Sequence, residues 1–368
     1  MNVTALTNES IRKKPASKRA SRQRSSSTPL EVVRLCYNES PYGMPPKSHE
    51  ALFAAETRSN NYPDFFAFEL KKALAAEYSL ETTNIITVAG SSALIDIIGC
   101  TFINPGDEVL YCSPTYEAFA DMANAYGGVP APIPLAGDLS FDLDGLYNAI
   151  TPKTKIVVIV NPNNPTGGYV PSSKIEEFIR KAPDDILIVV DEAYIDFVDH
   201  PDNYSMVKLI QEGIDKPVLI LRTFSKIYGM AGIRVGYGVS SPEVIDELAK
   251  SSHAWNVSNV SQAAAIVALG EKEFIANVKS EIVKGREYVS RELKRLGCAV
   301  NDTQANFIYF SSPLAPEDIT AALKEKDVLI ATFAWSRVSI GTPEENRAFI
   351  DALEEVLAEV ALKEQSPA

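Results

Sequence analysis

Small and hydroxylic residues at two places in this 368-residue chain could bind a phosphate group. The turn AGSSA (89–93) opens a predicted helix, and a helix N-terminus offers free backbone N–H groups and a favourable dipole to an anion. The segment TFSK (223–226) adds two hydroxyls, and an arginine follows eight positions after Lys226. Each feature alone is weak evidence, because small residues also allow close packing of a helix on a sheet. Together they predict a cradle for one phosphate, formed by Ser91, Ser92, Thr223, Ser225 and Arg234.

A second set of residues could hold the ring and the aldehyde of a cofactor. Asp191 follows the apolar run ILIVV, so its carboxylate needs a partner such as a protonated ring nitrogen. Asn164 and Tyr194 could hydrogen-bond a phenolate oxygen, and Tyr116 could stack on an aromatic ring. The amine of Lys226 could form a Schiff base with an aldehyde. A phosphate, a protonated ring nitrogen, a phenolate and an aldehyde together define pyridoxal phosphate.

Apolar, β-branched stretches precede these residues and are expected to position them. They are DEVLYCSPTY (107–116), KIVVIVNPNNPTGG (155–168), ILIVVDEAY (186–194) and VLILRTFSK (218–226). Strands that are apolar along their whole length are typical of a largely parallel sheet covered by helices on both faces. Ligands of such sheets bind beyond the carboxyl ends of the strands, where these candidate residues gather.

The composition of the chain argues against several classes of protein and of binding site. The net charge of −13 argues against broad binding of nucleic acid or of an anionic membrane. The four scattered cysteines favour free thiols in a reducing compartment over zinc or disulfides, and the three histidines lack the spacing of metal ligands. No apolar run reaches membrane-spanning length. We therefore expect a cytoplasmic protein that binds small molecules and no metal.

The first thirty residues differ from the rest of the chain. The stretch IRKKPASKRASRQRSSSTP (11–29) is basic and serine-rich, and it lacks the apolar core of a secretory signal. Its composition is typical of a disordered tail. The other interpretation is a segment that becomes ordered over a site containing an anion.

Four motifs closely resemble the fold-type-I, pyridoxal-phosphate-dependent aminotransferases of class I/II, and within them the histidinol-phosphate aminotransferase branch. In family order they are NPNNPTGG, VVDEAY, TFSKIYGMAGIRVGY and RVSIGTPEEN. The resemblance extends from LCYNESPYG (35–43) to the C-terminal helix. It implies an α/β fold with a mostly parallel seven-stranded sheet between helices in a large domain, plus a smaller α+β domain. The expected divisions are a tail (1–30), an N-terminal part of the small domain (31–58), the large domain (59–260) and a linking helix with the remaining small domain (261–368).

The resemblance also implies a role for each candidate residue on the cofactor side. Lys226 would be the Schiff-base lysine and would move the proton at the substrate α-carbon, while Asp191 would pair with the ring nitrogen. The other residues would hold the ring oxygen (Asn164 and Tyr194), the ring face (Tyr116) and the phosphate (Ser91, Ser92, Thr223, Ser225 and Arg234).

On the substrate side, the resemblance implies roles for an arginine and an asparagine and a contribution from a second subunit. Arg337 matches the arginine that grips the substrate α-carboxylate, and Asn38 matches a substrate-side asparagine. Trp335, two positions before Arg337, could line the same pocket. Tyr62, in NNYPD, matches a tyrosine that the family sends from the second subunit to the cofactor phosphate. This match implies a homodimer with shared active sites.

Two departures from the branch concern the substrate. Relatives carry an arginine for the substrate phosphate in a V-R-P-F-like segment, whereas this chain has Ala331 in LIATFAWSR. A usual PY-x-PG segment, which contributes a substrate-facing tyrosine, is replaced by RQRSSSTP. We therefore expect a non-phosphorylated amino acid, aromatic or otherwise bulky given Phe333 and Trp335, with a 2-oxo acid as amino acceptor. The opposing interpretation is that tail arginines replace the missing charge, namely Arg19, Arg22 and Arg24.

Three alternative functions stay open at this point. A pyridoxal-phosphate-dependent lyase, decarboxylase or oxidase is one, because a fold does not determine which bond at the α-carbon breaks. A true histidinol-phosphate aminotransferase is the second. The third is a pyridoxal-phosphate-binding transcriptional regulator whose tail contacts DNA. Known fusions of that type place a helix-turn-helix before the aminotransferase-like part, and this tail contains no such pattern.

Overall fold

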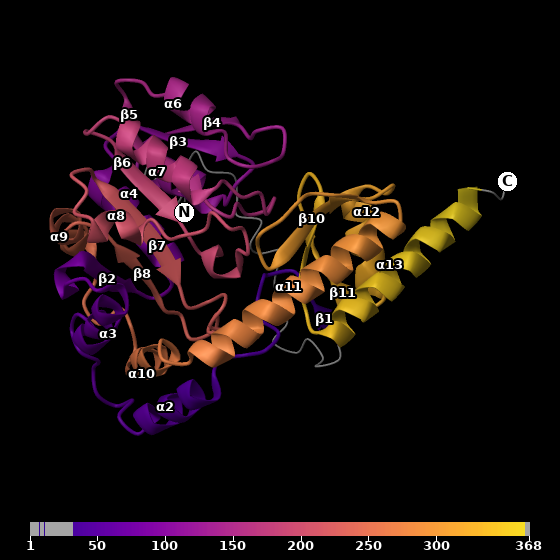
Figure 1. The fold of residues 1–368 in the computed structure, drawn as a ribbon, viewed down its shortest axis with the longest axis horizontal. Helices are drawn as coiled ribbons and strands as arrows, with labels where there is room; N and C mark the ends of the chain where they lie inside the picture. Colours follow the sequence, from indigo (N-terminus) through magenta and orange to yellow (C-terminus); the bar gives the residue numbers. More distant parts are fainter. Residues whose placement is uncertain (1–6, 8–10, 12–31, 365–368) are drawn as a thin grey trace.

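The computed structural model of the chain describes residues 7, 11 and 32–364, and it consists of two parts joined by a long helix (Figure 1). The larger part is built on a seven-stranded sheet and the smaller on a four-stranded one. Helix α11 (Lys272–Arg295) extends from the larger part across the smaller one. The expected basic tail at 1–30 lies outside the described residues, apart from two isolated positions.

The seven-stranded sheet has the order β2-β8-β7-β6-β5-β3-β4 and is mostly parallel. Only β8 runs against its neighbours β2 and β7, and the other pairings are parallel. The strands are β2 (Ile85–Val88), β3 (Glu108–Ser113), β4 (Val129–Pro134), β5 (Thr154–Val160), β6 (Leu187–Asp191), β7 (Val218–Thr223) and β8 (Gly236–Val239). This topology confirms the α/β fold class.

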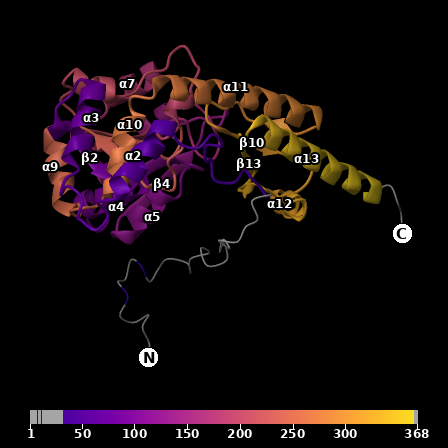
Figure 2. The same cartoon turned by 90° about the horizontal axis from the view of Figure 1, so that it is seen from below.

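The central strands are buried on both faces, as their uninterrupted apolar sequences predict. Every residue of β6 and β7 is buried, including the polar residues at their carboxyl ends. Helix α7 lies on one side of the sheet and α4 and α5 on the other (Figure 2). The helices of the larger part are α3 (Phe68–Tyr78), α4 (Ser91–Phe102), α5 (Ala118–Ala125), α6 (Leu143–Asn148), α7 (Ser172–Lys181), α8 (Val207–Gln211) and α9 (Pro242–Ser251), with short 3-10 turns η3 (Thr82–Asn84) and η4 (Ile195–Phe197).

The smaller part is an antiparallel sheet with helices packed on it. Its strands have the order β12-β13-β10-β9, and the short β1 pairs in parallel with β11. The elements are β1 (Val33–Arg34), β9 (Ala299–Val300), β10 (Phe307–Ser311), β11 (Val328–Leu329), β12 (Ala331–Thr332), β13 (Ser336–Ser339), α12 (Pro316–Glu325) and α13 (Pro343–Glu364).

The N-terminal segment expected to lie with the small domain is divided between the two parts. Strand β1 joins the smaller part through β11. Helix α2 (Pro46–Glu56) instead packs against α10 (Asn259–Ala268), beside α3 of the larger part (Figure 1). Pairing in a sheet and packing of a helix are independent constraints, so a boundary drawn at residue 58 from order along the chain does not coincide with the spatial division.

None of the helices between residues 32 and 364 combines the length and the apolar composition that a membrane crossing requires. Within the same described part of the chain, no group of three His, Cys, Asp or Glu residues is placed to hold a metal ion.

Candidate active site

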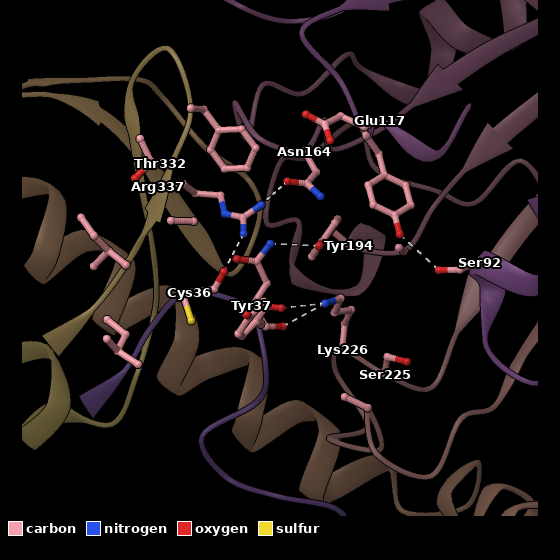
Figure 3. A pocket seen from close by; sticks show the side chains of 18 of the residues that line it. Cys36, Tyr37, Ser92, Glu117, Asn164, Tyr194, Ser225, Lys226, Thr332 and Arg337 are labelled. Atoms are coloured by element: carbon pink, nitrogen blue, oxygen red, sulfur yellow. Dashed lines mark hydrogen bonds between the residues drawn. The ribbon is translucent and has the colours of Figure 1, made fainter. Parts of the chain in front are cut away.

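A cavity of about 1010 Å³ lies between the carboxyl ends of the central strands and the smaller part. Figure 3 shows side chains from both parts pointing into it. Most of the residues singled out in the sequence line this cavity, namely Asn38, Ser91, Ser92, Tyr116, Asn164, Asp191, Tyr194, Thr223, Ser225, Lys226, Arg234 and Arg337. Residues up to 300 positions apart therefore meet at one site.

One end of the cavity is built to receive an anion. Helix α4 begins at Ser91, and no side chain caps its first turn, so backbone N–H groups face the cavity end. Gly90 has a φ of +89° and lies against Arg234, and a Cβ atom there would overlap the guanidinium. Arg234 donates to the hydroxyl of Ser225 at 3.4 Å and to the carbonyl of Ala231 at 2.9 Å. The arginine is therefore held beside the helix N-terminus, as a phosphate requires.

Asp191 places a buried carboxyl group on the cavity wall. Its side chain is 5% exposed and accepts a hydrogen bond from the backbone N–H of Ala193 at 3.0 Å. Burial raises the pKa of Asp191 to about 6, although that hydrogen bond lowers it; the charge of Glu192 raises the pKa further and that of Lys226 lowers it. A cation that faced this carboxylate would stabilise its charged form. The protonated ring nitrogen of pyridoxal phosphate fits this position.

Lys226 is held in the cavity and is only partly exposed. Its Nζ donates to the carbonyls of Tyr37 at 3.1 Å and Asn38 at 3.2 Å (Figure 3). The same nitrogen lies 5.4 Å from the ring centre of Tyr194. The amine therefore lies in the same cavity as the helix N-terminus and Arg234.

Asn164 and Arg337 connect the two parts across the cavity. The guanidinium of Arg337 donates through Nη1 to Oδ1 of Asn164 and through Nη2 to the carbonyl of Cys36 at 2.9 Å (Figure 3). It packs between the rings of Phe307 and Phe333, with its central carbon 5.3 and 5.0 Å from their centres. The aromatic rings orient a planar group that can bind a carboxylate with two hydrogen bonds.

Asn38, Tyr194 and Tyr116 complete the side of the site that faces a ring. Asn38 donates from Nδ2 to the hydroxyl of Tyr194 at 3.0 Å and accepts from the hydroxyl of Ser339 at 3.0 Å. The hydroxyl of Tyr116 lies 3.2 Å from that of Ser92 (Figure 3). Tyr116 is partly exposed toward the cavity, so its ring is available for stacking.

Trp335 lies outside the cavity wall, contrary to expectation. Its ring stacks on Tyr309 with centres 5.3 Å apart, and its backbone N–H donates to the Tyr309 hydroxyl at 3.0 Å. The expectation rested on the two-residue spacing to Arg337, which places side chains on one face of a strand. Strand β13 begins only at Ser336, and Trp335 belongs to the preceding turn, where that alternation does not hold.

Tyr62 also lies away from the cavity within a single chain. Its side chain is 80% exposed, and its ring lies 4.8 Å from that of Trp255. It lines a separate hollow with residues 59–63 and 258–260.

The structure adds residues to the cavity wall that the sequence did not indicate. They come mainly from α12 and the adjoining hairpin and include Thr320, Lys324, Asp327 and Thr332, together with Cys36 and Tyr37 after β1 and Glu117 before α5. Thr320 and Lys324 are four positions apart on a polar helix face that resembles an ordinary solvated one. Only the packing of α12 beside β12 shows that this face borders the site.

Comparison with known proteins agrees with this geometry. Residues 31–353 match the family model of aminotransferase class I and II. The chain is 36% identical to a histidinol-phosphate aminotransferase of Moorella thermoacetica, over 89% of this chain and 86% of that protein. It is 35% identical to an aromatic amino acid aminotransferase of Thermobifida fusca, over 86% and 88%. A crystal structure of histidinol-phosphate aminotransferase from Sinorhizobium meliloti with pyridoxal-5'-phosphate superimposes with a TM-score of 0.87 at 26% identity, covering 96% of this chain and 98% of that one.

The family model covers most of the chain, and a buried carboxyl group, a helix N-terminus with Arg234 beside it and a lysine amine line one cavity. The chain therefore belongs to aminotransferase class I and II and is a pyridoxal-phosphate-dependent aminotransferase.

Proposed function

We propose that this aminotransferase acts on a non-phosphorylated amino acid with an aromatic or otherwise bulky side chain and passes the amino group to a 2-oxo acid. Ala331 carries the proposal. It lines the cavity opposite Arg337 in the β12–β13 register, where the resembling branch has an arginine for the substrate phosphate. A methyl group offers no charge to a phosphate, and an unpaired phosphate in a partly dry pocket is costly. The 35% identity to an aromatic amino acid aminotransferase supports this choice.

In this proposal the substrate binds between the two parts of the molecule. Arg337 holds the α-carboxylate with two of its guanidinium nitrogens, in a plane kept by Phe307 and Phe333. Phe333 also lines the cavity and offers an apolar surface to the substrate side chain. Asn38 is fixed beside the reacting carbon by its bonds to Tyr194 and Ser339.

The cofactor, when bound, withdraws electrons from the substrate α-carbon. Lys226 Nζ takes the proton from that carbon and returns one, so it acts as general base and then as general acid. Asp191, whose pKa burial raises to about 6, would be largely ionised at neutral pH and would keep a proton on the ring nitrogen. Asn164 and Tyr194 would hydrogen-bond the ring oxygen, and Tyr116 would cover one face of the ring, since all three line the cavity. The phosphate would be held by Ser91, Ser92, Thr223, Ser225 and Arg234, which line the same cavity.

The substrate proposal is tested by kcat/KM for phenylalanine, tyrosine and histidinol phosphate. We expect the aromatic amino acids to exceed histidinol phosphate by at least about tenfold, and Ala331→Arg to raise kcat/KM for histidinol phosphate by about tenfold or more. Ala334→Arg is the matched control, because residue 334 is exposed in the same hairpin and does not line the cavity. A wild-type preference for histidinol phosphate would overturn the proposal.

One observation favours histidinol phosphate as a second candidate. Lys324 lines the cavity on the same wall as Ala331, and the hydroxyls of Thr320 and Thr332 lie there 2.8 Å apart. These groups could bind the distal phosphate of the substrate, with Lys324 on α12 taking the place of an arginine on β12. Asp327 lines the same wall and opposes an anion, which is why the first candidate is preferred. The Moorella relative is a histidinol-phosphate aminotransferase at 36% identity.

Lys324→Met separates the two candidates. If Lys324 holds a substrate phosphate, this variant loses kcat/KM for histidinol phosphate by about tenfold or more and keeps it for phenylalanine. Under the first candidate, neither substrate changes by more than about twofold.

We further propose a homodimer in which Tyr62 reaches the phosphate site of the partner. Four aromatic residues form an exposed cluster around Tyr62, namely Tyr62, Phe65, Phe66 and Trp255, with ring centres 4.5 to 5.0 Å apart between neighbours. Their exposed fractions range from 45% to 80%. Such a patch on a water-soluble surface is typical of a protein–protein interface.

Mixed dimers test the sharing of the sites. Combining Lys226→Ala with Tyr62→Phe subunits places both lesions in one site and leaves the other wild-type. We expect activity to rise above the mean of the two separate variants as subunits exchange. A fully active monomer in sedimentation experiments would overturn the dimer.

We also propose that the protein is located in the cytoplasm. The four cysteines, at residues 36, 100, 112 and 298, form no disulfide. Burial raises the pKa of Cys112 to about 12 and that of Cys298 to about 11, which favours the protonated thiols. Free thiols are typical of proteins in reducing compartments, and cell fractionation with an antibody tests the location.

A further inference from the structure

A buried ion pair lies directly behind the carboxylate expected to face the ring nitrogen. Arg222 on β7 and Glu192 after β6 have side chains that are 8% and 2% exposed, with Nη1 and Oε2 3.3 Å apart. The other guanidinium nitrogen lies 2.7 Å from Oδ1 of Asp196. Arg222 and Glu192 do not line the cavity, whereas their chain neighbours Thr223 and Asp191 do. Neighbouring residues of a strand face opposite sides of a sheet, which explains this arrangement.

The ion pair connects the two strand ends that carry the cofactor-side chemistry. Asp191 pairs with Leu221 in the β6–β7 register, and the backbone N–H of Glu192 donates to the carbonyl of Leu221 at 3.0 Å. Strand β7 ends at Thr223, three residues before Lys226. A bond between Arg222 and Glu192 therefore holds the end that carries Asp191 against the end that leads to the lysine.

Glu192 faces three donors that favour its carboxylate form, although burial raises its pKa. It accepts from the hydroxyl of Ser205 at 2.6 Å and from the backbone N–H of Met206 at 2.7 Å, in addition to Arg222. Its negative charge raises the pKa of the adjacent Asp191, while Lys226 lowers that pKa. Arg222 is the buried cation that faces Glu192 and opposes its charge.

Other titratable groups complete this network on the Arg222 side. Tyr237 lies opposite Arg222 in the β7–β8 register, and its hydroxyl is 2.6 Å from that of Tyr78. Burial raises the pKa of both tyrosines, so they stay neutral in the physiological range. Asp196 is the second carboxylate that faces the guanidinium. Among the charged groups, Glu192 and Lys226 act directly on the pKa of Asp191, whereas Arg222 and Asp196 act on that of Glu192.

We propose that Arg222 is a positioning residue that acts through Glu192 to keep Asp191 negatively charged toward the cofactor ring nitrogen at neutral pH. The inference rests on the proposed role of Asp191. Arg222 itself touches neither substrate nor cofactor, since it lies outside the cavity.

The test measures the dissociation constant of pyridoxal phosphate from the full-length apoprotein between pH 5 and pH 8. Binding to a protonated Asp191 must release a proton, so affinity falls below the pKa of that carboxyl group in the apoprotein. We expect Arg222→Gln to move the start of this fall upward by about one pH unit, because Glu192 is then uncompensated. Glu192→Gln should move it downward, because a neighbouring negative charge is removed. Arg222→Lys should restore the wild-type profile.

The opposite signs separate this role from a structural one, because both glutamine variants break the same ion pair. Shifts in the same direction, or no shift in either variant, would overturn the proposal. If Arg222→Gln does not fold, Glu192→Gln decides alone, since only the charge effect predicts a downward shift.

A 1-deaza analogue of pyridoxal phosphate, with carbon in place of the ring nitrogen, tests the underlying role of Asp191. If the wild-type apoprotein binds the analogue and the cofactor with the same pH profile, the role of Asp191 is wrong, and the inference about Arg222 is overturned with it. If the affinity falls only for the cofactor, and the pH profiles of the two glutamine variants are not shifted, only the role of Arg222 is overturned.

Discussion

The strand-end side of the cavity and the wall formed by α12 and the β12–β13 hairpin are built in different ways. On the strand-end side, Asp191 and Thr223 terminate fully buried strands, and their backbones are fixed by the sheet. The opposite wall consists of a two-residue strand, a turn and an exposed helix face that carries Lys324. The rigid side suits a cofactor that is the same throughout the family. The other side can vary its side chains without disturbing the sheet, which suits a choice of substrate.

Lys226→Ala should have the largest effect. It removes the amine that we propose binds the cofactor and moves the proton, so we expect kcat to fall about 10⁴-fold or more and the visible absorbance of the lysine-bound cofactor to disappear. Steady-state kinetics and absorbance spectra check both losses. Lys250→Ala, at an exposed ion pair, is the control. Near-normal turnover in Lys226→Ala would show that the strand-end side does not hold the reacting amine.

On the strand-end side, Asp191→Asn should lower the activity and raise the stability of the apoprotein. The variant loses the negative charge that we propose faces the ring nitrogen, so kcat should fall about 10²- to 10³-fold. The apoprotein should gain stability, because burial raises the pKa of Asp191 from 3.8 to about 6. A raised carboxyl pKa means that the folded state loses stability as the pH rises through that range, and asparagine does not ionise. Thermal melting of the wild-type and Asp191→Asn apoproteins at pH 4 and pH 7.5 measures the difference in their stability at each pH. An equal difference at the two pH values would contradict this prediction.

Arg337→Lys should weaken substrate binding without changing the cofactor. Lysine lacks the planar fork that binds a carboxylate with two hydrogen bonds, so we expect kcat/KM to fall about 10- to 100-fold, mainly through KM. The affinity for pyridoxal phosphate should stay within about threefold, measured on the apoprotein. The exposed Arg291→Lys is the matched control. A loss of cofactor affinity equal to the loss in kcat/KM would mean that the two sides of the cavity are not separable.

Trp335→Leu should have the smallest effect on catalysis. Its ring stacks on Tyr309 outside the cavity, so kcat/KM should change by less than about twofold, while stability falls by about 1–2 kcal/mol from lost packing. Denaturant unfolding and steady-state kinetics measure the two quantities. A tenfold loss of kcat/KM with unchanged stability would extend the substrate wall to Trp335.

The sequence by itself determined the strand-end side of this protein. Continuous apolar runs predict strands that a sheet must bury, and a polar residue directly after such a run lies at the edge of the sheet where ligands bind. Asp191 and Thr223 were placed in this way, and the motifs around Lys226 and Asn164 indicated the family. The local signal is strong there because burial and chemistry constrain the same few adjacent residues.

Tertiary structure alone decided the opposite wall. The face of α12 that carries Lys324 has the pattern of a solvated helix, and only its packing beside β12 brings it to the cavity. Trp335 lies two positions from Arg337, yet the start of β13 turns it toward Tyr309. Glu192 and Arg222 are separated by 30 positions, and the parallel pairing of β6 with β7 places them together behind Asp191. In each case a long-range pairing or packing contact determines which way a side chain points. The neighbouring residues in the sequence do not indicate that contact.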